Sequence, residues 1–284
     1  MAVRLDALVD ARWVAAHLDD PRVRVLHCGS DQATRAQYDA EHVRAAIYID
    51  GYTDMCEDRE VRALVPLRDS MERILERLGI TPEDEIVCYA PQRSMWPGRV
   101  YWVLRYFRFE RVHMLDGGID DLRAAGVPLT SDVPASRSVG AVRLPEPDVA
   151  ILATADQVLA AVQDAESRGA PVVLDCRNDD EFAGREHGHR PAARLGRIPR
   201  AQHVNWELIV DAQGHLLPRE QLRALYAAAG IDGTRAVYPY CGGGIRAAVG
   251  WFALHELLGY ELVANYDGSW AEWAHRTELP VEVG

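Results

Sequence analysis

The sequence predicts an α/β protein built from two similar domains, each a mostly parallel β-sheet with helices on both faces. Three observations support this prediction. Short apolar runs alternate with helical segments, the order of the segments repeats once along the chain, and a stretch rich in Pro, Ser and Val separates the two copies. With 284 residues, the chain is also longer than most single hydrophobic cores.

The first copy starts with the apolar run VRVLHC at 23–28. Its further strands are expected within 42–50, 85–90 and 111–118, and its helices around Tyr38, over 70–80 and over 98–107. The run RLGI places Gly79 where a helix would end, because glycine adopts the left-handed conformation that closes many helices.

The second copy repeats this order, with strands expected within 172–177, 197–206, 236–241 and 261–270. Phe182 takes the place of Tyr38, and the segment 219–231 matches the helix before the third strand. TADQ at 154–157 is a capping box that predicts a helix through about Ser167. We therefore assign residues 1–130 and 150–284 to the two domains and 131–149 to a linker. A cleft between duplicated domains would suit a small ligand.

Charge and composition exclude several functions. A net charge of −12 argues against a nucleic-acid or anionic-membrane partner, since either would require a basic face. No run approaches ~20 consecutive apolar residues, and the acids within the first 20 residues indicate neither a signal peptide nor a membrane anchor. The five cysteines have no metal-ligand or disulfide spacing, so we expect reduced thiols in a cytoplasmic protein.

Cys241 directly follows a predicted strand and precedes a helix expected from about Ala247. The loop between them consists of Gly242, Gly243, Gly244, Ile245 and Arg246. Glycines allow several backbone N–H groups to point inward and form an anion cradle, and the following helix adds the positive end of its dipole. Both effects favour a thiolate. We predict Cys241 as a nucleophile and the five loop residues as substrate contacts; a buried structural cysteine would not explain three consecutive glycines.

Together these segments resemble the tandem-domain rhodanese family, the thiosulfate and 3-mercaptopyruvate sulfurtransferases. The resemblance rests on VLDCR (173–177), GRIPRAQHVNW (196–206), YCGGGIR (240–246) and LLGYELVANYDGSWAEW (257–273). In that family the first domain lacks the nucleophile, and here Ala90 occupies the position that matches Cys241. The resemblance implies that Cys241 takes sulfur from a small anionic donor as a persulfide and passes it to cyanide or to a thiol, including a protein thiol. It implies no metal and no organic cofactor.

Departures from the family pattern bear on the donor. Gly243 stands where mercaptopyruvate enzymes carry Ser, which favours thiosulfate. Arg190 falls where the family places one substrate-binding arginine, but Glu181 stands where it places another. A carboxylate there would repel an anionic donor unless Arg190 or Arg246 offsets it. Arg197 replaces the usual histidine of the Gly-His-Ile-Pro motif.

Two other functions stay open. A cysteine phosphatase or arsenate reductase shares the order strand, Cys, loop, Arg, helix, but its loop has one residue more than the four between Cys241 and Arg246. A regulatory or persulfide-carrying module that serves a partner protein would use the same cysteine. His187 and His189 lack a third ligand and indicate a surface loop rather than a metal site.

Overall fold

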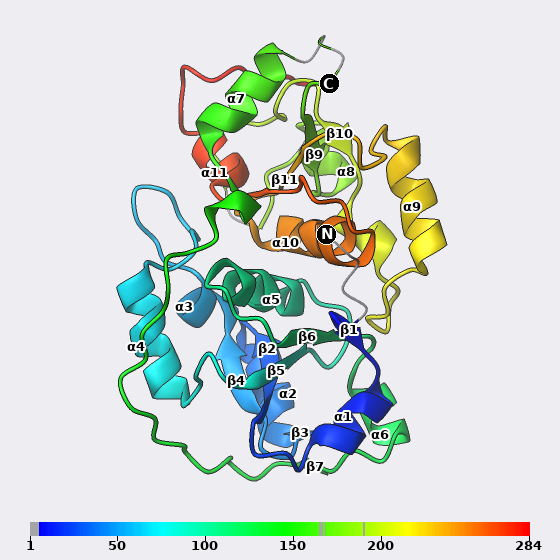
Figure 1. Ribbon diagram of the computed structural model, residues 1–284. Coiled ribbons are helices and arrows are strands. Elements are labelled where there is room, and N and C mark those ends of the chain that lie inside the picture. The colour runs from blue at the N-terminus through cyan, green and yellow to red at the C-terminus, as the bar shows by residue number, and fades with distance from the viewer. Residues whose placement is uncertain (1–5, 165–166, 168, 190) are drawn as a thin grey trace.

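The first sheet contains five parallel strands, and it confirms the predicted α/β class (Figure 1). A computed structural model describes residues 6–164, 167, 169–189 and 191–284. The strand order is β1-β6-β5-β2-β4. The strands span Leu8–Val9 (β1), Val23–Gly29 (β2), Ile47–Asp50 (β4), Glu85–Tyr89 (β5) and Val112–Leu115 (β6). A small antiparallel pair, β3 (His42–Val43) and β7 (Leu129–Thr130), lies beside it.

The second half repeats this topology. Strands β10 (Gln202–His203), β9 (Val172–Asp175) and β11 (Val237–Tyr240) are parallel, as are β12 (Asn265–Tyr266) and β8 (Leu152–Ala153). A parallel bridge between Val237 and Val263 joins the two groups. The resulting order, β8-β12-β11-β9-β10, matches that of the first sheet strand for strand, so the predicted duplication is confirmed.

Helices cover both faces of each sheet. In the first half, α1 (Ala11–His17), α2 (Gln32–Ala40) and α6 (Ile119–Ala124) bury one face, while α3 (Gly51–Met55), α4 (Arg68–Leu78) and α5 (Trp96–Tyr106) bury the other. In the second half, α7 (Ala155–Gln163) and α11 (Ser269–Trp273) face α9 (Arg219–Ala228) and α10 (Ile245–Trp251) across the sheet. Short helices at Asp179–Phe182 (α8), Val149–Ile151 and Trp206–Ile209, and a π-helix at Phe252–Leu257, complete the fold.

The two halves meet through α5 and α10, which lie side by side at the centre of the molecule (Figure 1). A Cβ added to Gly98 of α5 would lie 3.2 Å from the Cα atom of Val249, so glycine permits this close approach. The ring of Tyr101 meets that of Phe252 edge to face. One apolar core therefore continues from the first sheet through both helices to the second sheet.

A repeated hydrogen bond marks equivalent positions in the two halves. The amide of Val43 donates to the hydroxyl of Tyr89 at 3.1 Å, and the amide of Ile198 donates to that of Tyr240 at 3.2 Å. Each tyrosine ends a central strand, β5 or β11. The residue that follows is Ala90 in the first half and Cys241 in the second.

Two predicted helix ends differ from the structure. Helix α7 has the expected capping box at Thr154 but ends at Gln163 rather than near Ser167. Helix α10 begins at Ile245 instead of Ala247, because Gly244 is already in the left-handed conformation that closes the loop. Gly79 ends α4 with φ of 67°, as expected.

The segment 131–149 runs along α4 without a strand before the turn at Val149 (Figure 1). Its amides at Val142 and Leu144 donate to Glu76 and Glu72 of that helix. Membrane crossing would need a longer and more apolar helix than any that the described residues form.

His27 should make stability depend on pH. Its side chain is fully buried beside Tyr89, and burial, with a smaller effect of His42, lowers its pKa to about 4. The unfolded chain binds this proton below about pH 6.5, whereas the folded protein stays neutral down to about pH 4. Stability therefore falls as pH drops through that window, by about 3 kcal/mol from this group.

Urea unfolding of the wild type and of His27→Asn at a series of pH values tests this expectation. The difference in unfolding free energy between the two should shrink as pH falls from about 6.5 to about 4. His275→Asn, at an exposed position, is the control and should give a constant difference. If the unfolding free energies of His27→Asn and the wild type changed with pH in parallel, His27 would not be the source of the pH dependence.

Arg99 holds the two halves together through a buried ion pair. Its guanidinium is inaccessible and lies 2.5 Å from the carboxylate of Asp267. Arg99→Met should lower the unfolding free energy by about 3–5 kcal/mol, because it leaves Asp267 buried without its partner. Arg68→Met removes an exposed pair with Glu146 and should cost no more than about 1 kcal/mol. Similar losses for both variants in urea unfolding would refute this role of Arg99.

Candidate functional site

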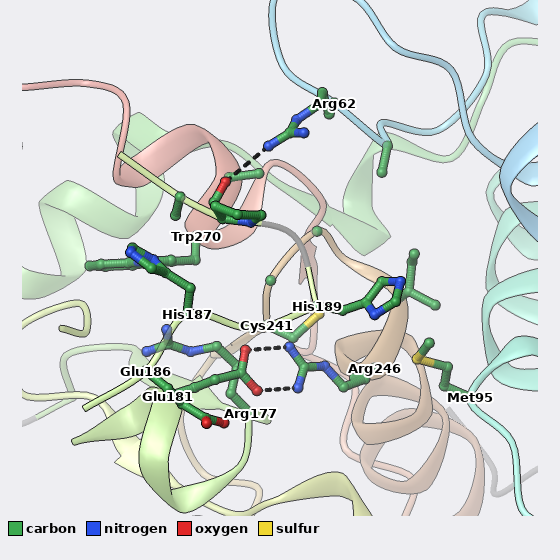
Figure 2. Close-up of a pocket in the computed structure, with 18 of the residues that line it drawn as sticks. Arg62, Met95, Arg177, Glu181, Glu186, His187, His189, Cys241, Arg246 and Trp270 are labelled. Atoms are coloured by element: carbon green, nitrogen blue, oxygen red, sulfur yellow. Dashed lines mark hydrogen bonds and ion pairs between the residues drawn. The ribbon is translucent and has the colours of Figure 1, made fainter. Parts of the chain in front are cut away.

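Cys241 lines a pocket of about 170 Å³ between the two halves of the protein. Strand β11 ends at Tyr240, so the cysteine is the first residue of the loop that leaves the sheet. Figure 2 shows Cys241 at the base of the pocket, with Arg246, His187 and His189 around it. The predicted contacts Gly242, Gly243, Ile245 and Arg246 also line the pocket. Gly244 does not, and Arg190 lies outside the described residues.

The hydroxyl of Ser269 anchors this loop from behind. It accepts hydrogen bonds from the amides of Cys241 at 3.1 Å and Gly244 at 2.9 Å, and it donates to the carbonyl of Tyr266 at 2.7 Å. The next two amides of α11, from Trp270 and Ala271, donate to the carbonyls of Cys241 and Gly242. The start of α11 thus holds both ends of the loop.

Four amides of the segment 242–246 are left for a ligand. Among the described residues, the amides of Gly242, Gly243, Ile245 and Arg246 have no acceptor, and all four residues line the pocket. Gly244 faces away: its φ is 72°, and an added Cβ would lie 2.6 Å from the carboxylate of Asp267. The amides of Cys241 and Gly244 are not available to a ligand, because they bind Ser269.

Arg246 lies beside Cys241 but is already paired. Its guanidinium donates to both carboxylate oxygens of Glu181, at 2.5 and 2.8 Å. Burial opposes the charge of Arg246, but the hydrogen bonds to Glu181 and the proximity of Cys241 raise its pKa. The carboxylate that the sequence identifies as a departure from the family pattern is thus offset by Arg246.

A second buried pair supports the neighbouring strand. Arg177 and Asp175 lie 2.6 Å apart, and the Tyr240 hydroxyl donates to Asp175 at 2.5 Å. The guanidinium of Arg177 also lies over the Trp270 ring, 4.9 Å from its centroid. Arg177 and Trp270 form part of the pocket wall, so these contacts fix the wall beside Cys241.

The first half supplies the opposite wall through Tyr52, Arg62, Ala63 and Met95. Arg62 donates to the carbonyl of Pro191 at 3.1 Å and so ties its own loop to the loop that follows α8. Neither half forms the pocket alone. Arg93 of the first half does not line this pocket and lies 3.7 Å from Glu207.

His187 and His189 line the pocket. No group of three or more potential metal ligands occurs within the part of the chain that the structure describes. Both side chains are exposed, which leaves the imidazoles in contact with solvent at the pocket mouth.

The other four cysteines are buried and form no disulfide, and none of them lines this pocket. Cys176 directly follows β9, and its amide donates to the carbonyl of Tyr240. Burial, followed by the proximity of Cys241, raises the pKa of Cys176 well above its usual range, which favours the thiol. Cys241 is itself only 1% exposed, but among the five cysteines it is the one that borders the pocket, and it is therefore the candidate nucleophile.

Sequence reasoning does not identify Ser269, Asp267 or Arg62 as parts of the site. Ser269 lies in the segment SWAE, whose pattern is that of a capping box for its own helix. Its hydroxyl instead serves the Cys241 loop, and its φ of 49° is unusual for a residue other than glycine. No local pattern identifies such a partner, because the contact spans 28 residues.

A family model described as a rhodanese-like domain matches this chain twice, at residues 10–125 and 154–276. A Mycobacterium bovis protein named "Putative thiosulfate sulfurtransferase 1" is 35% identical over 286 residues, which cover 99% of each chain. The sulfur carrier protein TtuD of Thermus thermophilus is also 35% identical over 286 residues, covering 98% of this chain and 97% of that protein.

Solved structures share the fold at lower identity. An anaerobic ergothioneine biosynthesis enzyme from Chlorobium limicola, solved with trimethyl histidine, superposes with a TM-score of 0.85 at 24% identity. The match covers 99% of this chain and 71% of that one. The protein YnjE gives a TM-score of 0.82 at 20% identity, covering 99% of this chain and 69% of that one.

Ser269→Ala should loosen the Cys241 loop. The change removes the shared acceptor of two buried amides, which should cost about 1–3 kcal/mol in unfolding free energy. Hydrogen–deuterium exchange across residues 241–246 should become faster. Ser94→Ala, in the corresponding loop of the first half, is the control and should leave exchange at 241–246 unaltered. Unchanged exchange in Ser269→Ala would show that the hydroxyl does not hold the loop.

Proposed function

Since this chain belongs to the rhodanese family, we propose that it is a sulfurtransferase in which Cys241 carries the transferred sulfur as a persulfide. One observation supports this proposal above all others: of the five cysteines, only Cys241 lines the pocket between the halves. The first domain, with Ala90 after β5, has no nucleophile at the matching position and serves as the second wall of the pocket. We assign the domains to residues 1–130 and 150–284.

The proposed reaction has two steps. The Cys241 thiolate attacks the outer sulfur of the donor, the sulfur–sulfur bond breaks, and sulfite leaves thiosulfate with the bonding electron pair. An acceptor thiolate or cyanide then attacks the terminal sulfur of the persulfide, and the Cys241 thiolate leaves. The amides of Gly242, Gly243, Ile245 and Arg246 are the backbone donors available to the terminal sulfur. The cysteine sulfur is the nucleophile and the outer sulfur of the donor is the transferred group, so neither step requires a metal or an organic cofactor.

Thiosulfate is the favoured donor over 3-mercaptopyruvate. Gly243 offers no hydroxyl to the pocket, and Ala63 lies on the facing wall, where an added Gly243 Cβ would be 3.5 Å away. Nothing at this position can therefore bind a carbonyl oxygen through a side chain. Arg190 and Arg246 remain candidates for donor binding, whereas Gly244 does not line the pocket and its amide binds Ser269. None of the five cysteines forms a disulfide, which supports a reducing compartment such as the cytoplasm.

A second candidate is a persulfide carrier that delivers sulfur to a partner protein. It is favoured by the likeness to a relative named as a sulfur carrier. Steady-state turnover of thiosulfate with cyanide or a small dithiol distinguishes the two. A sulfurtransferase should turn over many times, whereas a carrier should form the Cys241 persulfide once and not transfer the sulfur to a small acceptor. A phosphatase is disfavoured, because Glu181 neutralises Arg246 and places a carboxylate beside the pocket that would repel a phosphoryl dianion.

Intact-protein mass spectrometry after incubation with thiosulfate tests the proposal. The wild type should gain the mass of one sulfur atom, which peptide mapping should locate on Cys241. Cys241→Ser should gain none and should lose turnover, while its unfolding free energy changes little. Cys176→Ser alters a buried neighbouring thiol and should still form the persulfide. Sulfur on any other residue, or turnover by Cys241→Ser, would refute the assignment.

A further inference from the structure

The ion pair between Glu181 and Arg246 is buried in the pocket wall, next to the reacting sulfur. Glu181 is the third residue of α8 and only 2% exposed, and Arg246 is the second residue of α10, directly after the Cys241 loop. Both residues line the pocket. The dashed contacts in Figure 2 join both carboxylate oxygens to the guanidinium, beside the Cys241 side chain.

Glu181 has little freedom to leave Arg246. Its amide donates to the side chain of Asn178 at 2.7 Å, which fixes it in the first turn of α8. A Cβ added to Gly188 would lie 2.2 Å from a carboxylate oxygen of Glu181, so the loop after α8 passes directly over this carboxylate. The pair is therefore a permanent part of the pocket wall, and Arg246 cannot turn to a ligand without leaving Glu181 buried and unpaired.

The remaining charges of the pocket are largely balanced as well. Among the described residues, the arginines that line it are Arg62, Arg177 and Arg246, and the carboxylates are Glu181 and Glu186. Arg177 is neutralised from behind by Asp175 at 2.6 Å. Arg62 belongs to the exposed rim and contacts the Pro191 carbonyl. Close to Cys241, the electrostatic potential at a bound donor therefore depends mainly on how completely the negative charge of Glu181 offsets the positive charge of Arg246.

We propose that Glu181 is a specificity-determining residue that lowers the preference of the Cys241 site for doubly charged sulfur donors relative to singly charged ones. The inference rests on the proposed persulfide chemistry. The electrostatic energy between a fixed unit charge and a partly buried ligand a few ångströms away is proportional to the charge on the ligand. The carboxylate therefore opposes a dianion such as thiosulfate about twice as strongly as a monoanion with the same terminal sulfur.

Glu181→Gln tests this role, because it removes the charge and keeps the size of the side chain. Two donors are compared: thiosulfate, which is doubly charged, and benzenethiosulfonate, which presents the same outer sulfur with one charge and releases a sulfinate. The readout is the ratio of kcat/KM for thiosulfate to kcat/KM for benzenethiosulfonate, with one fixed thiol acceptor. The ratio should rise about tenfold in Glu181→Gln.

Asp179→Asn is the matched control. Asp179 lies on the same helix, is 82% exposed, and its loss changes the net charge of the protein equally. Its ratio should shift by less than about twofold, because an exposed charge is screened. A rise in Asp179→Asn equal to that in Glu181→Gln would mean that overall charge, not the buried pair, sets the preference, and would overturn the proposal.

The double variant Glu181→Gln/Arg246→Gln keeps the test decisive if the single variant folds poorly, because it leaves no buried unpaired charge. Since Glu181 already cancels Arg246, removing both should leave the ratio within about twofold of the wild type. A tenfold fall would show that Arg246 attracts dianions despite Glu181, which contradicts the proposal. Absence of sulfur on wild-type Cys241 with either donor would instead refute the proposed function itself, and this inference with it.

Discussion

The loop that carries Cys241 keeps its shape because one hydroxyl, that of Ser269, binds the amides at both of its ends. The loop is rich in glycine and would otherwise adopt many backbone conformations. Asp267 closes the space behind Gly244 and at the same time receives Arg99 from the first half. The contacts that position Cys241 are therefore continuous with the contact that joins the two halves.

Buried charge pairs lie beside Cys241 and between the two halves. Arg246 is bound by Glu181, Arg177 by Asp175, and Arg99 by Asp267. Pairs of this kind hold side chains in place while contributing little net field, since each buried charge has a partner within hydrogen-bond distance. The amides of Gly242, Gly243, Ile245 and Arg246 remain uncommitted in the pocket that Cys241 borders. In the proposed reaction, these backbone groups would stabilise negative charge on sulfur more than the paired arginines.

The sequence predicts the duplicated α/β fold and the position of Cys241 directly after a strand, because these features follow from local patterns. Through the family pattern it also places Glu181 where Arg246 could offset its charge. It does not predict the partners that arrive from distant segments. Ser269 and Pro191 reach the site through contacts that span 28 and 129 residues, respectively. The sequence cannot show that a serine beyond the next strand binds two amides of the Cys241 loop.

The structure of the protein after treatment with thiosulfate tests the central claim most directly. Crystals soaked with the donor should show one additional sulfur atom bonded to the Sγ atom of Cys241, inside the pocket and within hydrogen-bond distance of the amides of Gly242 or Gly243, while Ser269 still holds the loop from behind. An additional sulfur on another cysteine, or a Cys241 side chain turned into the core with those amides facing solvent, would contradict the account.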